Sequence, residues 1–170
     1  MVDAVVSAQL ERPVRASVEV VAHCPLGLPV VVAVPPLLDD GTPFPTRYWL
    51  SCPAARARIG RLEAAGGVKA MDRRLRSDPP FAEAVAGANH RYALQRDALL
   101  PPDAVHRPVG GVGGGTGGVK CLHAHYADHA AGNDNPIGGL VAPWVEPLDC
   151  TIPCVEGDPP ASNPAWSEPR

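Results

Sequence analysis

Residues 118–138, with the sequence GVKCLHAHYADHAAGNDNPIG, hold the densest group of chemically active side chains in the chain. If this segment is a helix, Cys121 and His125 lie four residues apart on one face, with Asp128 and His129 at its edges. A cysteine and a histidine at this spacing can bind one metal ion together. The segment therefore predicts a metal site or a proton-transfer site.

A helix is favoured over a strand in this segment because alanine, a good helix former, recurs through it. In a strand, Cys121, His123 and His125 would instead point to the same face. We expect a helix over residues 119–131, and this orientation sets which of the side chains can act together.

Two further cysteines, Cys24 and Cys52, each end a stretch that predicts a strand. With Cys121 and His125 they would complete a set of three thiolates and one imidazole, which suits tetrahedral zinc. An iron–sulfur cluster is an alternative, and three buried, unreactive thiols are another. A zinc ion with an open position would activate water for hydrolysis. The residues expected to assist as catalytic or supporting groups are His123, Asp128 and His129.

Cys52 has a second interpretation, as a nucleophile. It precedes Pro53, and proline is favoured at the first position of a helix. A thiol at a helix N-terminus has a lowered pKa, and His123 or His125 could serve as its base. This hypothesis makes the protein a cysteine-dependent hydrolase of a phosphate or acyl substrate.

The glycine-rich stretch VGGVGGGTGGVK, residues 109–120, lacks the signature of a nucleotide-binding loop because Lys120 is followed by Cys121. Such a stretch before a helix can still bind an anion through its backbone amides, assisted by Lys120. A flexible linker is the alternative interpretation. Asn135, in a predicted turn before Pro136, is a second candidate for binding an anion or other ligand.

The stretch DGTPFPTRYWLSCP, residues 40–53, places polar Thr46 and Tyr48 beside apolar Phe44 and Trp49. This combination predicts a pocket lining, and a rigid proline-rich loop packed on the sheet is the alternative. The arginines that follow are expected on a solvated helix face: Arg56, Arg58 and Arg61.

The pattern of the whole chain predicts an α+β fold in which a small antiparallel sheet, over about residues 17–52, is packed by three to four helices. Valine-rich runs indicate the strands, and prolines after capping residues indicate helix starts. Strands are expected over residues 17–24, 30–34 and 47–52, and helices over residues 53–65, 68–76, 79–99 and 119–131.

The domain organisation follows from where prolines and glycines gather. Residues 1–16 are expected to be a flexible lead-in, residues 17–145 a single globular domain, and residues 146–170 a disordered proline-rich tail. Cys150 and Cys154 fall in that tail, and their spacing alone is not diagnostic.

Composition excludes several classes of protein. The net charge of −3 gives no basic field for nucleic acid. No apolar run approaches the ~20 residues of a membrane span, and the first residues lack the pattern of a secretory signal. We therefore expect a cytoplasmic protein whose five cysteines carry no structural disulfides.

Three phrases in order, DGTPFPTRYWLSCP, RLEAAGGV and VKCLHAHYADHAAGNDNPIG, resemble the bacterial, mainly actinobacterial, domain-of-unknown-function family 501. VVAHCPLGLPVVV is similar to the family's opening, so the resemblance covers residues 17–141. It implies a single-domain cytoplasmic protein, with a partner in cell division or phosphate metabolism. A non-enzymatic partner-binding module linked to division is thus an alternative function. The matching positions are Cys24, Cys52, Lys120, Cys121, His123, His125, Asn135 and Pro136.

Overall fold

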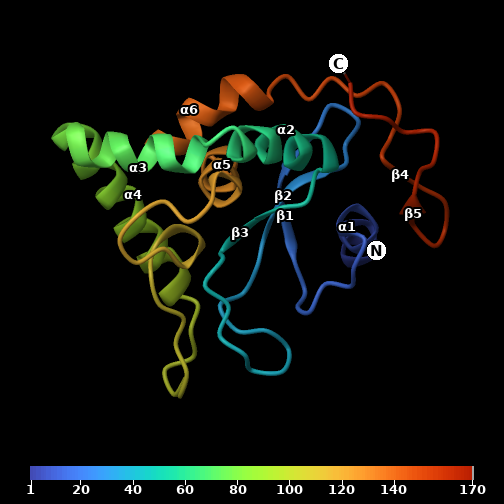
Figure 1. The fold of residues 1–170 in the computed structure, drawn as a ribbon. Helices are drawn as coiled ribbons and strands as arrows, with labels where there is room; N and C mark the ends of the chain where they lie inside the picture. Colours follow the sequence, from blue (N-terminus) through green and yellow to red (C-terminus); the bar gives the residue numbers. More distant parts are fainter. Residues whose placement is uncertain (170) are drawn as a thin grey trace.

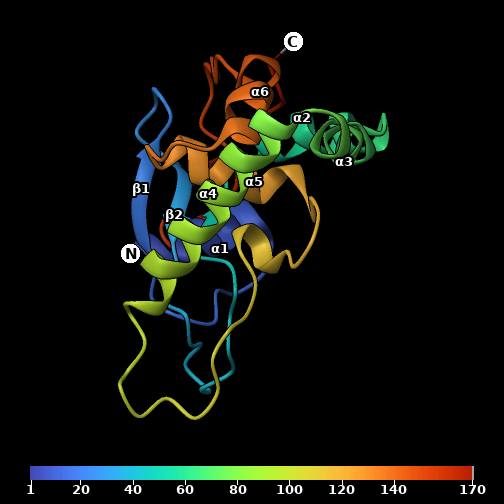
Figure 2. The ribbon, with the colours of Figure 1, turned by 90° about the vertical axis from the view of Figure 1, so that its left-hand side faces the viewer.

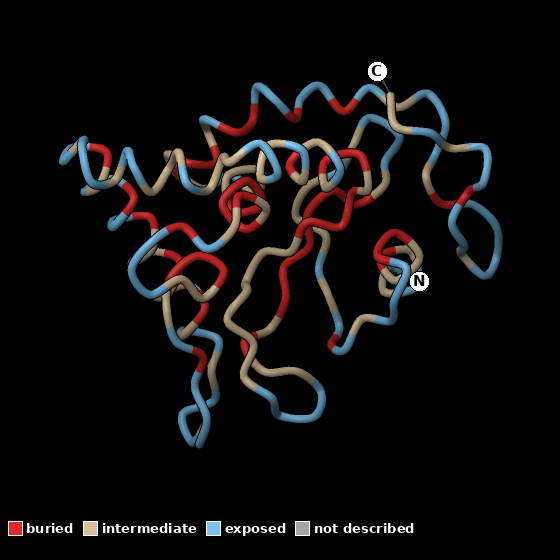
Figure 3. Tube along the Cα trace, viewed as in Figure 1, coloured by how far each residue is buried: buried red, intermediate tan, exposed pale blue. Residues whose placement is uncertain are grey.

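A three-stranded antiparallel sheet forms the centre of the molecule in the computed structural model, which describes residues 1–169. Its order is β1 (Glu19–His23), β2 (Pro29–Ala33), β3 (Tyr48–Leu50) (Figure 1). Every residue of β2 is buried, as expected for a valine run with helices on both faces. Figure 3 shows burial concentrated along β2 and in the helix that crosses the sheet. The predicted α+β class is confirmed.

Five helices follow the sheet along the chain and cover one side of it (Figures 1 and 2). Local sequence sets two of their starts. Cys52 is the N-cap of the first, directly before Pro53. Asp78 caps the third by accepting a hydrogen bond from the Phe81 amide at 3.1 Å. The five are α2 (Pro53–Ala64), α3 (Gly67–Ser77), α4 (Pro79–Asp97), α5 (Leu122–Ala130) and α6 (Pro136–Val145).

Helix α6 occupies a stretch where the sequence predicted only a turn and re-entry. Asn135 is its N-cap and accepts from the Gly138 amide at 3.0 Å, while Pro136 takes the first helical position. Gly138 permits close packing on α5, because a Cβ there would collide with the His125 carbonyl and the His129 Cβ. The glycine that weakens the local helix signal is thus required by the contact between α6 and α5.

The predicted flexible lead-in of residues 1–16 is wrong. Helix α1 (Val2–Leu10) lies on the opposite face of the sheet from α5. Val6 and Leu10 are buried there in a cluster with Val32 and Val34. Both faces of the valine-rich strand β2 are apolar and must be shielded from water. Helix α1 packs on the face that the later helices leave open.

Residues 101–118 connect α4 to α5, and the glycine-rich second half of this connector, for which a flexible linker was one interpretation, is fixed in place. Buried Arg96 donates to the carbonyls of Gly110 and Pro108 at 2.8 and 3.2 Å. The Asn89 side chain accepts from the Val112 amide at 2.9 Å, at the short 3-10 helix η1 (Val112–Gly114). The first half of the connector projects away from the rest of the molecule (Figure 2).

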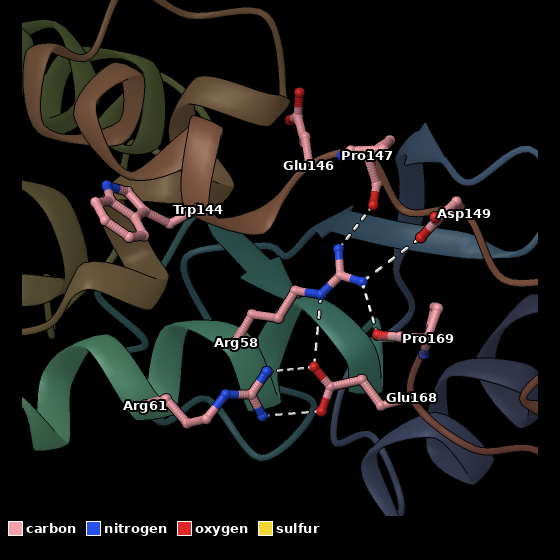
Figure 4. A pocket seen from close by; sticks show the side chains of 8 residues that line it. All are labelled: Arg58, Arg61, Trp144, Glu146, Pro147, Asp149, Glu168 and Pro169. Atoms are coloured by element: carbon pink, nitrogen blue, oxygen red, sulfur yellow. Dashed lines mark hydrogen bonds and ion pairs between the residues drawn. The ribbon is translucent and has the colours of Figure 1, made fainter.

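The C-terminal segment is packed against the domain, which corrects the predicted disordered tail of residues 146–170 as far as Pro169. Strands β4 (Val155–Glu156) and β5 (Ala161–Ser162) form a small ribbon. Arg58 fixes the segment at both ends: it donates to the Pro147 carbonyl at 2.7 Å and to the Pro169 carbonyl at 3.1 Å (Figure 4). The segment has too few apolar residues for a core of its own, but Leu148 and Trp166 pack into the main core of the domain.

No helix in residues 1–169 is long and apolar enough to cross a membrane.

The packing of α1 makes a testable prediction. Val6→Ala should lower the free energy of unfolding by about 2 kcal/mol, because it removes buried apolar volume from a fully covered position. Urea denaturation measures the change. Val2→Ala, on the same helix but 42% exposed, is the matched control and should change stability little. Equal stability of the two variants would contradict the packing described for α1.

Candidate functional site

The four predicted metal ligands, Cys24, Cys52, Cys121 and His125, do not converge. Among residues 1–169, no three His, Cys, Asp or Glu side chains are arranged to hold a metal ion. One reason is local: Cys121 precedes α5 in an extended conformation (φ −157°, ψ 148°), so it is out of helical register with His125. The structure therefore lends this predicted zinc or iron–sulfur centre no support.

His125 belongs instead to a buried polar cluster that joins α4, α5 and α6. At its centre is Asp128, whose side chain is fully buried. Its carboxylate accepts from Arg91 at 2.7 and 3.2 Å and from Asn135 at 2.8 Å. Asn133 donates to the same carboxylate at 3.0 Å. The hydrogen bonds of this predicted catalytic aspartate are thus made to neighbouring helices and to the turn between them.

The protonation of His125 follows from the orientation of Asn135. The Asn135 amide nitrogen donates to Asp128, and its oxygen accepts from the Gly138 amide, so that oxygen faces His125 Nδ1 at 3.1 Å. Nδ1 must therefore carry a hydrogen. Burial lowers the pKa of His125, which favours the neutral ring. The ring is a buried hydrogen-bond donor in this cluster.

A cavity of about 340 Å³ lies where β3, α2, η1 and the start of α5 meet. We call it the α5 pocket. Its volume is within the ~300–1,000 Å³ range of small-molecule sites. It brings together side chains from the two stretches that the sequence marked, around the tyrosine–tryptophan pair and around the cysteine–histidine segment. The residues that line it are Thr46, Tyr48, Trp49, Leu50, Arg56, Gly113, Lys120, Cys121, His123 and Ala124.

The lining of the α5 pocket combines cationic and apolar side chains. Arg56 and Lys120 carry positive charge, and no carboxylate is among the lining residues. Tyr48 of β3 supplies apolar surface, whereas the Trp49 ring packs with Phe44 on the α1 face of the sheet. Three backbone amides of the glycine loop, those of Gly111, Gly114 and Gly115, donate to carbonyls within the loop.

His123 is held in place at the edge of the α5 pocket by two acceptors. Its Nδ1 lies 3.2 Å from a carboxylate oxygen of Glu63, and its Nε2 lies 3.2 Å from the Arg56 carbonyl. Glu63 also accepts from the Leu122 amide at 2.6 Å, which fixes the first turn of α5. Both ring nitrogens of His123 therefore lie next to oxygen atoms of the protein.

Burial suppresses the reactivity of the two cysteines closest to a helix start. It raises the pKa of Cys52 to about 11, and it also raises the pKa of Cys121. In both cases backbone amides of the following helix act in the opposite direction but do not offset the burial. The lowered pKa predicted for Cys52 is thus wrong.

The candidate residues separate into distinct places. Lys120, Cys121 and His123 line the α5 pocket, whereas Asp128 and Asn135 lie in the buried cluster. His129 packs at the contact between α5 and α6, against Gly138 and Gly139. The sequence missed Arg56, which was expected on a solvated face, and the role of Glu63. Only their spacing on α2, seven residues apart, could have suggested a shared face.

Two other hollows are less suited to a ligand. The one between α2 and α6 is crossed by ion pairs, in which Arg58 and Arg61 both contact Glu168 (Figure 4). The other, beside Trp49 on the α1 side of the sheet, is mostly apolar, and Arg15 at its edge is paired with Asp40.

The fold and the pocket define a small α+β protein with a cationic cavity at the start of a buried helix. The chain belongs to a family described as "Protein of unknown function (DUF501)", whose model matches residues 20–143. The match includes the α5 pocket and the polar cluster and ends before the C-terminal segment. Neither the curated proteins nor the solved structures contain a match to the chain.

The polar cluster predicts a large effect on stability. Asp128→Asn removes the negative charge that balances Arg91, so we expect a loss of about 3 kcal/mol in the free energy of unfolding. Asp134→Asn is the matched control, because the Asp134 side chain is exposed and only its carbonyl contacts Arg91. Chemical denaturation of both variants measures the difference. A loss below 1 kcal/mol for Asp128→Asn would contradict the central role of the cluster.

The raised pKa of Cys52 predicts slow alkylation. In the native protein at pH 8, iodoacetamide should leave Cys52 unmodified, because almost no thiolate is present about three pH units below its pKa of about 11. Modification followed by mass spectrometry reports each cysteine separately. Unfolded protein in urea is the control and should react at Cys52. Rapid modification of native Cys52 at pH 8 would restore it as a candidate nucleophile.

Proposed function

We propose that this protein binds a small ligand that combines an anionic group with an apolar body, and that it does so in the α5 pocket. The observation that supports this most is the lining itself, which combines Arg56 and Lys120 with apolar side chains and includes no carboxylate. Arginine and lysine donate charge-assisted hydrogen bonds to phosphate and carboxylate oxygens. Tyr48 would contact the apolar part.

Binding is favoured over catalysis by the state of the other polar groups in the α5 pocket. The thiol of Cys121 has a raised pKa, and both ring nitrogens of His123 are engaged. A cysteine-dependent hydrolase needs a thiolate and a free base. A metal-dependent hydrolase needs a ligand set, and the described part of the chain holds no such group of residues. A partner in cell division or phosphate metabolism stays a prediction from the family resemblance.

The proposal predicts that the two cations carry the affinity. Binding of phenyl phosphate, measured by calorimetry at low salt, should weaken about tenfold in Lys120→Met and in Arg56→Gln, because each loses a charge-assisted contact. Arg56→Gln leaves the backbone carbonyl that holds His123 in place, so the start of α5 should keep its structure.

Lys69→Met is the matched control, since it removes a lysine from the exposed surface of α3. It should bind phenyl phosphate as the unaltered protein does. Phenol tests the need for the anionic group and should bind far more weakly. Equal affinity of Lys69→Met and Lys120→Met, or no binding to the unaltered protein at millimolar phenyl phosphate, would refute the proposal.

A further inference from the structure

Neighbouring residues of β3 face opposite sides of the sheet, so Tyr48 and Trp49 belong to different cavities. Tyr48 packs toward the α5 pocket, whereas the Trp49 ring packs with Phe44 on the side covered by α1. A cavity of about 330 Å³ lies beside Trp49 on that side, and we call it the α1-side pocket. It suits a small inorganic anion less well than the α5 pocket, because Arg15 at its edge is already paired with Asp40.

The walls of the α1-side pocket are apolar side chains that the fold leaves partly exposed. They surround the second core cluster, whose buried centre includes Val32 and Val34. Apolar surface is unfavourable in water, so a hydrocarbon group in this pocket would complete the cover of the cluster. The half-buried apolar residues of the lining are Val14, Val18, Leu38, Phe44 and Trp49.

The α1-side pocket is preformed, because hydrogen bonds join its walls. One wall is the segment between α1 and β1, and the other is the loop that follows β2. The Asp39 amide donates to the Arg15 carbonyl at 3.1 Å and so joins the two walls. The Val18 amide donates to the Asp3 carboxylate at 3.1 Å, which fastens the first wall to α1. A preformed pocket loses little conformational freedom when a ligand binds.

Arg12 supplies a positive charge at the exposed edge of the pocket. Its guanidinium carbon lies 4.8 Å from the centroid of the Trp49 ring. None of the ion pairs formed among residues 1–169 involves Arg12, and no carboxylate is among the residues that line the pocket. The planar fork of an arginine matches the two oxygens of a carboxylate. Charge complementarity therefore favours a ligand with one anionic end and a hydrocarbon body.

We propose that the α1-side pocket binds a medium-chain alkyl carboxylate as a free small molecule. The hydrocarbon chain lies among the apolar walls, and the carboxylate accepts hydrogen bonds from Arg12. This site lies on the opposite face of the sheet from the α5 pocket and shares neither of its cations, Arg56 and Lys120. It is therefore independent of the function proposed for the α5 pocket.

The first test uses the unaltered protein and octanoate, followed by NMR of backbone amides and of tryptophan indole N–H groups. We expect saturable changes at residues 12–18 and 34–44 and at the Trp49 indole, while the Trp144 indole on α6 stays unchanged. Acetate, which lacks the chain, should cause no saturable change. The neutral analogue 1-octanol should bind about tenfold more weakly, because it cannot accept a charge-assisted pair of hydrogen bonds.

Two results of this titration would overturn the proposal. One is the absence of changes at residues 12–18 and 34–44 with millimolar octanoate. The other is equal affinity for octanoate and 1-octanol, which would assign the pocket to a neutral apolar occupant, for example a side chain of a partner protein.

The second test compares variants at exposed positions, which should fold as the unaltered protein does. Arg12→Gln should weaken octanoate binding about tenfold. Arg76→Gln, on the exposed surface of α3, is the matched control and should bind normally. Lys120→Met removes a cation of the α5 pocket and should leave the changes at residues 12–18 intact, so this test is separate from that of the α5 pocket. Equal binding by the two arginine variants, or loss of these changes in Lys120→Met, would disprove the assignment.

Discussion

The buried pair of Arg91 and Asp128 is the constraint on which the rest of the helical layer depends. A carboxylate with no solvent exposure is tolerated only where charge and hydrogen bonds balance it. Here the balance comes from α4 through Arg91 and from the N-cap of α6 through Asn135. Because Asp128 itself lies on α5, the three helices can satisfy it only in one mutual arrangement. That arrangement fixes the direction of α5, and therefore the position of its first turn beside β3.

The start of α5 is fixed a second time by Glu63 of α2, which bonds both the Leu122 amide and His123. The two ends of one short helix are thus held by charged groups from different neighbours. The α5 pocket lies beside the end held by α2. Its cations come from α2 and from the residue before Cys121, so its shape follows from how these helices are fixed. A rigid, largely preformed pocket is what small-ligand recognition requires.

Sequence patterns located most of the elements because the signals involved are local. The valine run of β2, the Cys52-Pro53 start and the Asp78 cap each act within a few residues. Helices α1 and α6 were missed because tertiary contacts decide them. Residues 2–10 form helix α1 because Val6 and Leu10 pack their apolar side chains on the second face of β2. Gly138, a helix breaker by propensity, is selected by its contact with α5.

The chemistry was harder to locate than the fold. The helical pattern grouped Cys121 with His125, whereas Cys121 lines the α5 pocket with His123 and Lys120, and their cationic neighbour Arg56 comes from another helix. The central claim is that the α5 pocket binds an anionic ligand. The most direct measurement is the change in backbone amide NMR shifts as phenyl phosphate is added. The account predicts that the largest changes fall at residues 46–50 and 120–124; changes confined to the hollow between α2 and α6 would contradict it.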